Sequence, residues 1–324
     1  MGVLSYFIVG GAGFIGGHFV DFLMADATTE AVTIYDNFSS GREWHFAAHI
    51  ADPRFRVVRG EVGNLDTLTA AMRGHHVVIH LASNPDIARA ATEPDIDFWQ
   101  GTLLTSNVVE AMRRSGAQRI LYASGSGVYG DIGTVEAGED FGPLIPISTY
   151  GASKLAGETL ISSYCYMFGM TGCIFRFGNV VGPRQTHGVG LDFVRRLLKD
   201  GSRLPILGDG SQSKSYVHVS DVVRAVICAH RNSKKQFDAY NVATGDYITV
   251  SEIAAIAVDC VGLPAGSVRF EFSGGPRGWK GDVPVVRINT DRIRRLGWAN
   301  TWSSGEALRA AMMELITDER AGRL

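Results

Sequence analysis

The sequence lacks the features that mark nucleic-acid-binding and membrane proteins. Its 31 lysines and arginines are balanced by 33 aspartates and glutamates, which leaves a net charge of −2 at pH 7. Nucleic acids and anionic membranes attract basic surfaces, so this balance predicts neither of them as a partner. Glycine or charge interrupts the apolar runs well before they reach the length of a membrane span.

Cysteine is also scarce, and its spacing fits neither a disulfide framework nor a zinc site. The four cysteines are Cys165, Cys173, Cys228 and Cys260. The N-terminus has no basic segment followed by a cleavage site, and a predicted strand begins almost at once. We therefore expect no metal and a location in the reducing cytoplasm.

What the sequence does contain is a regular alternation of strands and helices. Predicted strands lie at 6–10, 31–36, 55–60, 76–82, 119–124 and 172–179. Segments with helical periodicity separate them, at 14–25, 64–73, 97–115 and 149–168. Apolar strands separated by helices predict an α/β fold with a Rossmann-type, doubly wound parallel sheet.

After residue 180 the pattern is less regular. We expect a loop at 181–190, a strand, glycine turn and strand over 204–221, a Gly/Pro-rich loop at 272–284, and helices at 191–200, 219–232, 251–261, 290–298 and 303–317. This pattern predicts a smaller, discontinuous C-terminal lobe. The predicted division gives 1–178 and 217–247 to the sheet domain, and 179–216 and 248–324 to the lobe.

The stretch "FIVGGAGFIGG" places Gly10, Gly13 and Gly16 directly after a predicted strand and at the start of a helix. Such glycines permit a tight turn, close approach of a pyrophosphate and close helix–strand packing. Asp36 ends the next predicted strand, where a carboxylate would bind ribose hydroxyls. This pattern predicts a dinucleotide site that favours NAD over its 2′-phosphorylated form. Arg42 lies nearby and could accept a 2′-phosphate, so the 2′-phosphorylated form of NAD stays a weaker alternative.

Tyr150 and Lys154 stand one helical turn apart at the start of the segment 149–168, where Ser148 or Thr149 is a suitable N-cap. A free tyrosine has a pKa near 10 and is a poor base at neutral pH. A neighbouring ammonium favours the phenolate and makes the tyrosine a better base. A solvated helix with an incidental aromatic is the alternative, but the glycine motif upstream favours a catalytic pair.

With these motifs the chain resembles the extended short-chain dehydrogenase/reductase family, specifically its nucleotide-sugar 4-epimerase and dehydratase branch. The similar motifs are "GGAGFIGG" (10–17), "YDNFSSG" (35–41), "HLAS" (80–83), "SGSGVYG" (124–130), "YGASK" (150–154), "RFGNVVGPR" (176–184), "LGDGSQSKSYVHVSD" (207–221) and "RGWKGD" (277–282). The resemblance implies that the sheet domain binds NAD and that the lobe binds a UDP-sugar. It also implies a homodimer that pairs the helices at 97–115 and 149–168.

By this resemblance, Tyr150 removes the proton of the sugar 4-hydroxyl while the C4 hydride passes to the nicotinamide. Lys154 holds the nicotinamide ribose and assists the tyrosine. The 4-keto sugar then rotates, and the hydride returns to its other face. The implied cofactor contacts, besides Tyr150 and Lys154, are Gly10, Gly13, Phe14, Ile15, Gly16, Asp36, Asn37, Ser39, Ser40, Gly41, Glu61, Val62, Leu81, Ala82 and Ser83.

The resemblance also implies substrate contacts. Lys214 and Arg277 grip the phosphates, Asn179 contacts the pyrophosphate or the sugar, and the segment 204–206 flanks the uracil. The implied substrate residues are Ser126, Asn179, Arg184, Val189, Pro205, Ile206, Lys214, Tyr216, Arg277 and Asp282.

The chain departs from the family pattern before "VYG". Gly125 stands where the family has a catalytic Ser or Thr, so we expect Ser126 or Ser124 to replace it, with preference for Ser126. Dehydratases and UDP-xylose-forming decarboxylases of the family carry carboxylates where this chain has Ser126 and Gly127, which favours an epimerase. Gly101 also replaces a common asparagine, and Glu61 an aspartate.

The sequence leaves more than one candidate for the sugar of the substrate. Val286 stands where bulky side chains in members of the family exclude 2-acetamido sugars, so the resemblance implies room for them. Arg184 could pair with a C6 carboxylate. UDP-glucose/UDP-galactose and UDP-glucuronate/UDP-galacturonate are both candidates, with UDP-N-acetylglucosamine behind them. The alternatives to a 4-epimerase are a UDP-sugar 4,6-dehydratase, a UDP-glucuronate decarboxylase, and a non-enzymatic NAD-binding sensor.

Overall fold

The computed structural model describes residues 3–323, and its central feature is a seven-stranded sheet. The strands are β1 (Leu4–Val9), β2 (Thr29–Asp36), β3 (Phe55–Arg59), β4 (Val77–His80), β5 (Arg119–Gly125), β7 (Thr171–Phe177) and β12 (Phe237–Val242). They lie in the order β12-β7-β5-β4-β1-β2-β3, and the pairs from β5 to β3 are parallel. The predicted Rossmann-type α/β fold is confirmed.

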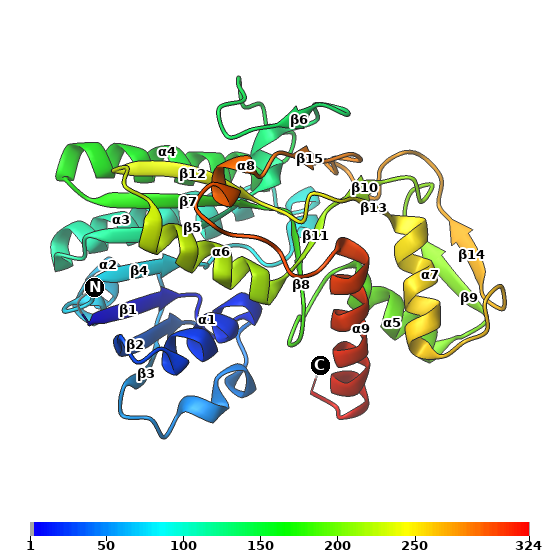
Figure 1. The fold of residues 1–324 in the computed structure, drawn as a ribbon, viewed down its shortest axis with the longest axis horizontal. Coiled ribbons are helices and arrows are strands. Elements are labelled where there is room, and N and C mark those ends of the chain that lie inside the picture. Colours follow the sequence, from blue (N-terminus) through cyan, green and yellow to red (C-terminus); the bar gives the residue numbers. More distant parts are fainter. Residues whose placement is uncertain (1–2, 324) are drawn as a thin grey trace. The chain divides into compact units, whose positions relative to one another are not determined.

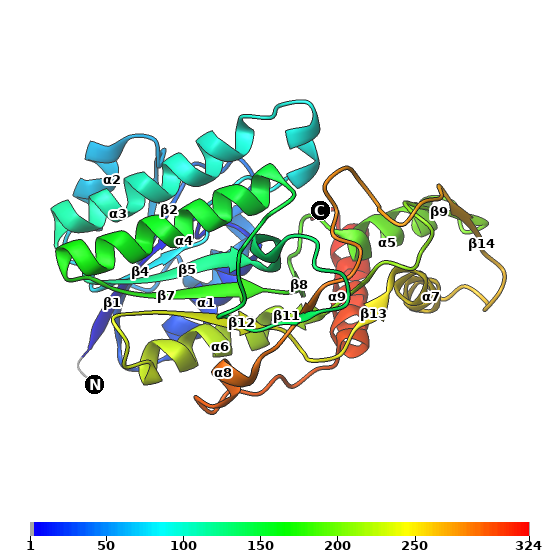
Figure 2. The same ribbon diagram turned by 90° about the horizontal axis from the view of Figure 1, so that it is seen from above.

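Helices cover both faces of this sheet, as Figure 2 shows. One face carries α2 (Leu65–Met72), α3 (Leu103–Ser115) and α4 (Thr149–Phe168), and the other carries α1 (Phe14–Ala25) and α6 (Val219–Asn232). Phe7, Ile8 and Val9 are fully buried along β1, as expected for a strand that helices cover on both sides.

Contacts divide the described chain into two compact units. The first comprises residues up to 128, 148–176 and 226–240, and contains most of the sheet. The second comprises 129–147, 177–225 and the residues from 241 onward. These bounds differ from the predicted division chiefly at 129–147, which joins the second unit.

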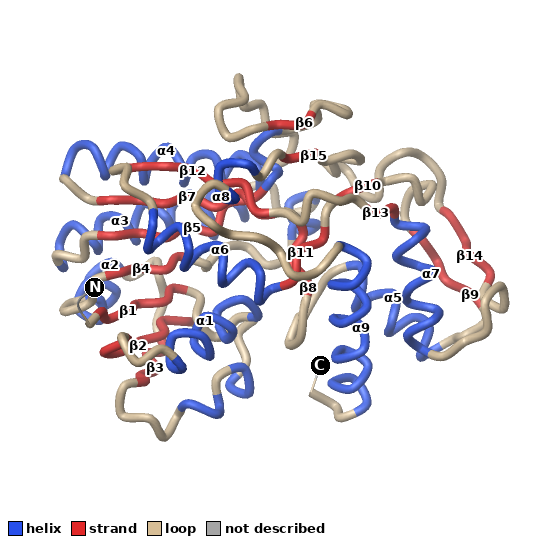
Figure 3. Tube along the Cα trace, viewed as in Figure 1, coloured by secondary structure: helices blue, strands red, loops and turns tan. Residues whose placement is uncertain are grey.

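The second unit has its own core, formed by α5 (Val189–Lys199), α7 (Val250–Val261), α9 (Ser304–Arg320) and the parallel pair of β9 (Arg203–Ile206) with β14 (Arg269–Phe272) (Figure 1). Its other elements are short: β6 (Glu136–Ala137) pairs with β15 (Arg287–Ile288), β8 (Asn179–Val181) with β11 (Tyr216–His218), and β10 (Ser213–Lys214) with β13 (Ile248–Thr249), and α8 is Asp291–Arg294. Figure 3 draws the segments around β6 and β15 mostly as loop.

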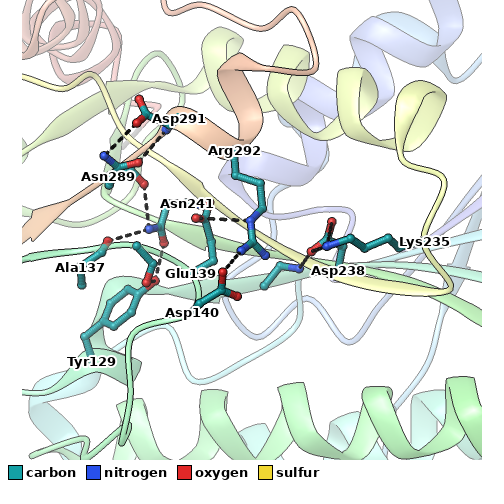
Figure 4. Close-up of polar contacts among 12 residues, drawn as sticks. Tyr129, Ala137, Glu139, Asp140, Lys235, Asp238, Asn241, Asn289, Asp291 and Arg292 are labelled. Atoms are coloured by element: carbon teal, nitrogen blue, oxygen red, sulfur yellow. Dashed lines mark hydrogen bonds and ion pairs between the residues drawn. The ribbon is translucent and has the colours of Figure 1, made fainter.

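A buried asparagine fixes the 129–147 segment within the second unit (Figure 4). The side chain of Asn241 is fully buried, accepts from the Tyr129 hydroxyl at 2.8 Å, and donates to Ala137 O at 3.0 Å and Asn289 O at 2.9 Å. Its backbone N–H donates to Glu139 at 2.9 Å. Buried amides that are fully paired hold a loop in one conformation, because each broken bond leaves an unsatisfied polar group.

Two local expectations were wrong, and one strand was not predicted. The strands predicted over 204–221 do form, with β9 paired to β14 and β11 to β8. The strand that was not predicted is β12. The helix expected from 97 starts as a π-helical turn at Phe98–Thr102, where a Cβ on Gly101 would lie 2.6 Å from Ser153 Oγ. The helix expected at 290–298 ends at Arg294, shortly before Gly297 at φ +95°.

Candidate active site

The glycine-rich loop between β1 and α1 has no room for side chains at its key positions. Gly10 has φ +79°, and a Cβ there would lie 2.7 Å from Ala82 N. A Cβ on Gly16 would lie 2.5 Å from Gly11 O. Among the described residues, no side chain caps α1 and no acid occupies its first turn. The first N–H groups of α1, at Phe14 and Ile15, are thus available to an anion such as a pyrophosphate.

The loop after β2 holds this glycine-rich loop through Ala12. Ala12 N donates to Asp36 Oδ2 at 2.9 Å, and Phe38 N donates to Asp36 Oδ1 at 2.8 Å. Ala12 O accepts from Arg42 N at 2.9 Å and from His45 Nδ1 at 2.8 Å. Burial raises the pKa of Asp36, although the two N–H groups favour its charged form. Sequence reasoning found Asp36 but missed His45, which has no motif spacing.

The other predicted cofactor residues lie in the same first unit. Asn37 Nδ2 donates to Glu61 Oε2 at 3.1 Å. Glu61, which stands where an aspartate was expected, therefore contacts the loop after β2. Leu81 N and Ala82 N donate to Val9 O, which places the end of β4 against the glycine-rich loop. The loops that follow β2, β3 and β4 contain the remaining predicted cofactor residues, which are Ser39, Ser40, Gly41, Val62 and Ser83. NAD fits the features found here: a cradle that a Cβ would fill, an uncapped helix start, and a buried carboxylate at the end of β2.

Tyr150 and Lys154 lie in the first two turns of α4, whose N-cap is Ser148, with its side chain accepting from Gly151 N at 3.1 Å. Lys154 is only 3% exposed, and its Nζ donates to Ala123 O at 2.8 Å. The ammonium lies 5.4 Å from the centre of the Tyr150 ring. Burial alone would lower the pKa of Lys154, but its interactions, first with Tyr150, raise it above the usual value. The alternative of a solvated surface helix is therefore wrong for Lys154.

The two candidate serines differ in their surroundings. Ser124 is buried, and its hydroxyl donates to Glu158 Oε1 at 2.6 Å; Glu158 in turn pairs with the buried Arg176 at 2.7 Å. Ser126 is half-buried in the 3₁₀ turn Ser126–Tyr129, and a Cβ on Gly127 would lie 3.7 Å from Gly151 Cα. This turn therefore touches the start of α4.

The predicted phosphate-binding cations lie in the second unit, each beside a carboxylate. Lys214 Nζ lies 2.5 Å from Asp282 Oδ1, and Arg277 Nη2 lies 2.6 Å from Asp131 Oδ2. Arg277 also donates to the Asp282 carbonyl, and Gly278 N donates to Asp282 Oδ2 at 3.0 Å. These four charged side chains form one cluster, and Asp131 is the member that sequence reasoning missed.

The remaining predicted substrate residues are more dispersed. Asn179 is exposed on β8, and Val189 opens α5. Ile206 and Tyr216 are buried in the core of the second unit, where Ile206 O accepts from Ser273 N and Tyr216 N donates to Ser304 Oγ, both at 2.9 Å, whereas Pro205 is exposed. Arg184 has φ +66°, a strained conformation that is typical of functional loops.

Neither a metal centre nor a membrane-spanning helix is found among the described residues. Among the residues that the structure describes, no group of three or more His, Cys, Asp or Glu side chains is arranged to hold a metal ion. No helix within 3–323 combines the length and apolarity needed to cross a membrane.

Comparison with known proteins agrees with this geometry. A UDP-glucose 4-epimerase from Mycolicibacterium smegmatis is 32% identical over 298 residues, 90% of this chain and 92% of that protein. A dTDP-glucose 4,6-dehydratase from Actinoplanes sp. is 32% identical over 274 residues, 82% and 85% of the two chains. The crystal structure of a UDP-galactose 4-epimerase superimposes with a TM-score of 0.85 at 33% identity, covering 97% of this chain and 99% of that one. The sequence model of the NAD dependent epimerase/dehydratase family matches residues 6–243, and the chain belongs to this family, whose cofactor is NAD.

Proposed function

We propose that this protein is an NAD-dependent UDP-sugar 4-epimerase. The observation that carries the proposal is a buried Lys154 beside Tyr150, next to a turn, Ser126–Tyr129, that contains no carboxylate. Dehydration or decarboxylation needs acid–base groups for steps beyond C4, whereas epimerisation needs one base and a hydride acceptor. UDP-glucose/UDP-galactose and UDP-glucuronate/UDP-galacturonate are the two substrate pairs proposed.

In this mechanism the chain positions the sugar and moves one proton. Tyr150, as the phenolate that the ammonium of Lys154 stabilises, takes the proton from the 4-hydroxyl and becomes neutral. Ser126 donates a hydrogen bond to the same oxygen. Bound NAD supplies the hydride acceptor and then the hydride donor. In the second unit, Lys214 and Arg277 bind the diphosphate, so that the sugar can turn while the nucleotide stays in place.

Two organisational features are proposed with this function. The first unit is the NAD-binding part, and the second unit is the nucleotide-sugar-binding part. The protein forms a homodimer through α3 and α4. Near the end of α4, Tyr166 and Met167 are 66% and 73% exposed, which is more than expected for large apolar side chains that have no partner surface.

Proton NMR in D₂O tests the reaction. The purified protein is incubated separately with UDP-glucose and UDP-glucuronate, first without and then with added NAD. The C4 epimer is expected with no deuterium at C4, because the hydride returns internally, and with none at C5, because epimerisation does not remove the C5 proton. Deuterium at C5 or loss of carbon dioxide would instead assign a dehydratase or a decarboxylase.

A Tyr150→Phe variant separates an enzyme from a sensor. It should lose about 10²–10⁴-fold in kcat, the range of a missing general base, and keep its affinity for NAD. Unchanged turnover in this variant would contradict the proposed role of Tyr150.

A further inference from the structure

A buried carboxylate lies beside the start of α4 and has no part in the mechanism above. Asp97 is 1% exposed and directly precedes the π-helical turn Phe98–Thr102. Its Oδ1 accepts from Asn84 Nδ2 at 2.9 Å, and its Oδ2 accepts from the Thr149 hydroxyl at 2.7 Å. Both donors are neutral. A charge buried among neutral groups is costly, so the fold has to supply an opposite charge nearby.

Lys154 is a buried positive charge that likewise has a neutral hydrogen-bond partner. Its ammonium is also buried, and its recorded hydrogen bond goes to a neutral acceptor, Ala123 O. The groups that raise the pKa of Lys154 against its burial are Tyr150, Tyr122 and, more weakly, Asp97. Burial raises the pKa of Tyr122 above its usual value, so this phenol is neutral at neutral pH. In the proposed mechanism Tyr150 loses its negative charge when it takes the proton of the sugar, so it cannot neutralise Lys154 throughout the reaction.

The other titratable groups around Lys154 do not neutralise it. On β4, burial and then the charge of Lys154 lower the pKa of His80 to about 3, so this imidazole is neutral. On α4 itself, Glu158 is paired with Arg176 at 2.7 Å. Asp97 is the carboxylate among the groups that raise the pKa of Lys154, and its hydrogen-bond donors within the described chain, Asn84 and Thr149, are neutral.

We propose that Asp97 is the charge partner of Lys154 and, through Thr149, a positioning residue for Tyr150. This role rests on the proposed function only in that Tyr150 acts on a sugar. The charge pairing itself rests on the burial of both groups and on the hydrogen bond that ties Asp97 to Thr149, five residues before Lys154 on α4. Asp97 keeps Lys154 protonated when the positively charged nicotinamide is bound. Thr149 is the first residue of α4, so its bond to Asp97 also fixes the helix start that carries Tyr150.

The charge is tested by titrating Lys154 directly. The chain has only six lysines, so ¹³Cε-lysine NMR gives few signals, and the Lys154 signal is assigned by its loss in Lys154→Arg. In Asp97→Asn, which keeps the side-chain size, the titration midpoint of Lys154 should fall by about one pH unit, a tenfold change in protonation. The alkaline limb of the kcat profile should move by the same amount.

Two matched variants separate charge from position. Thr149→Val removes the hydrogen bond but keeps the carboxylate, so kcat should fall while the Lys154 midpoint stays in place. Asp95→Asn removes a carboxylate two residues away that accepts from Trp99 Nε1, and it should change neither quantity. A merely structural Asp97 would lower kcat in Asp97→Asn without moving the Lys154 midpoint, and this result would overturn the proposal.

A reciprocal variant covers the case in which Asp97→Asn does not fold. In Lys154→Met, Asp97 loses its partner, so its ¹³Cγ signal should report proton uptake at a higher pH than in the wild type. An unchanged Asp97 titration there would also overturn the proposal. Because these titrations need no turnover, a shifted Lys154 midpoint in a protein that epimerises no UDP-sugar would leave the pairing standing and reject the proposed function alone.

Discussion

The two units hold their charged residues in opposite ways. In the first unit, Lys154 and Asp36 are 3% and 8% exposed, and each is fixed by backbone hydrogen bonds. In the second unit, the side chains of Lys214 and Arg277 are 23% and 40% exposed, and each contacts a carboxylate. If the proposed function holds, the first unit is preorganised for its ligand, whereas the cations of the second unit have to exchange protein partners for an anionic ligand.

The largest expected effect is at the glycine-rich loop of the preorganised unit. Gly10→Ala should weaken NAD binding about 100-fold or more, because φ is +79° and the new Cβ would lie 2.7 Å from Ala82 N. Isothermal titration with NAD measures the change. Gly63→Ala is the control, since nothing described lies within 4 Å of its Cβ position. Equal affinities in the two variants would contradict a rigid cradle.

The next effect distinguishes the two serines. Ser126→Ala should lower kcat about 10–100-fold, because a donor to the reacting oxygen is lost. Ser124→Ala should leave kcat nearly unchanged but lower the free energy of unfolding by about 1–2 kcal/mol, because buried Glu158 loses a donor. Urea unfolding and steady-state kinetics measure both.

Gly125 offers a way to sharpen that test. No described atom lies within 4 Å of a Cβ placed there, so Gly125→Ser should be accommodated. Combined with Ser126→Ala, it should restore part of the lost kcat. If Ser124→Ala proves the more damaging of the two single variants in kcat, the assignment of Ser126 is wrong.

Features set by local spacing could be predicted from the sequence. Helices α1 and α4 begin and end where expected, because a glycine turn and a Ser148 cap start them and Gly169 at φ +70° follows α4. The glycine-rich loop, Asp36 and the Tyr150–Lys154 pair were found for the same reason: each motif lies within one turn or one βα unit.

Features set by distant partners could not be predicted. Strand β12 joins the sheet beside β7, although about 60 residues separate the two strands in sequence, and its six residues carry no strong strand pattern. His45, Asp97 and Asp131 each gain their role from one side chain or carbonyl that lies 33, 52 and 146 residues away in sequence. No spacing rule in a single sequence identifies such contacts.

A pH effect is expected from the buried histidines of the first unit. Burial lowers the pKa of His80 to about 3 and of His230 to about 4, whereas unfolded histidine has a pKa near 6.5. The unfolded chain therefore binds more protons below pH ~6.5, so stability is full above that pH and falls as pH decreases towards ~4. Between these pH values each histidine should lower the free energy of unfolding by about 1.4 kcal/mol for every pH unit of acidification.

Urea unfolding at pH 7 and pH 5 measures this loss. His230→Phe keeps a ring against Tyr6 and removes one of the two titrating groups, so the loss between these pH values should be clearly smaller than in the wild type. An identical loss would show that His230 does not couple protonation to unfolding.

The smallest expected effect is in the second unit, where Asp131 competes with the ligand for Arg277. Asp131→Asn should tighten UDP binding by only about two- to fivefold at low salt, because a partly exposed ion pair contributes about 0.2–1 kcal/mol. The gain should vanish in high salt, where such pairs are screened. Asp140→Asn is the control, because Asp140 is 91% exposed and pairs with Arg292. Weaker UDP binding in Asp131→Asn would mean that Asp131 holds Arg277 in place for the diphosphate, and the second unit would then be preorganised like the first.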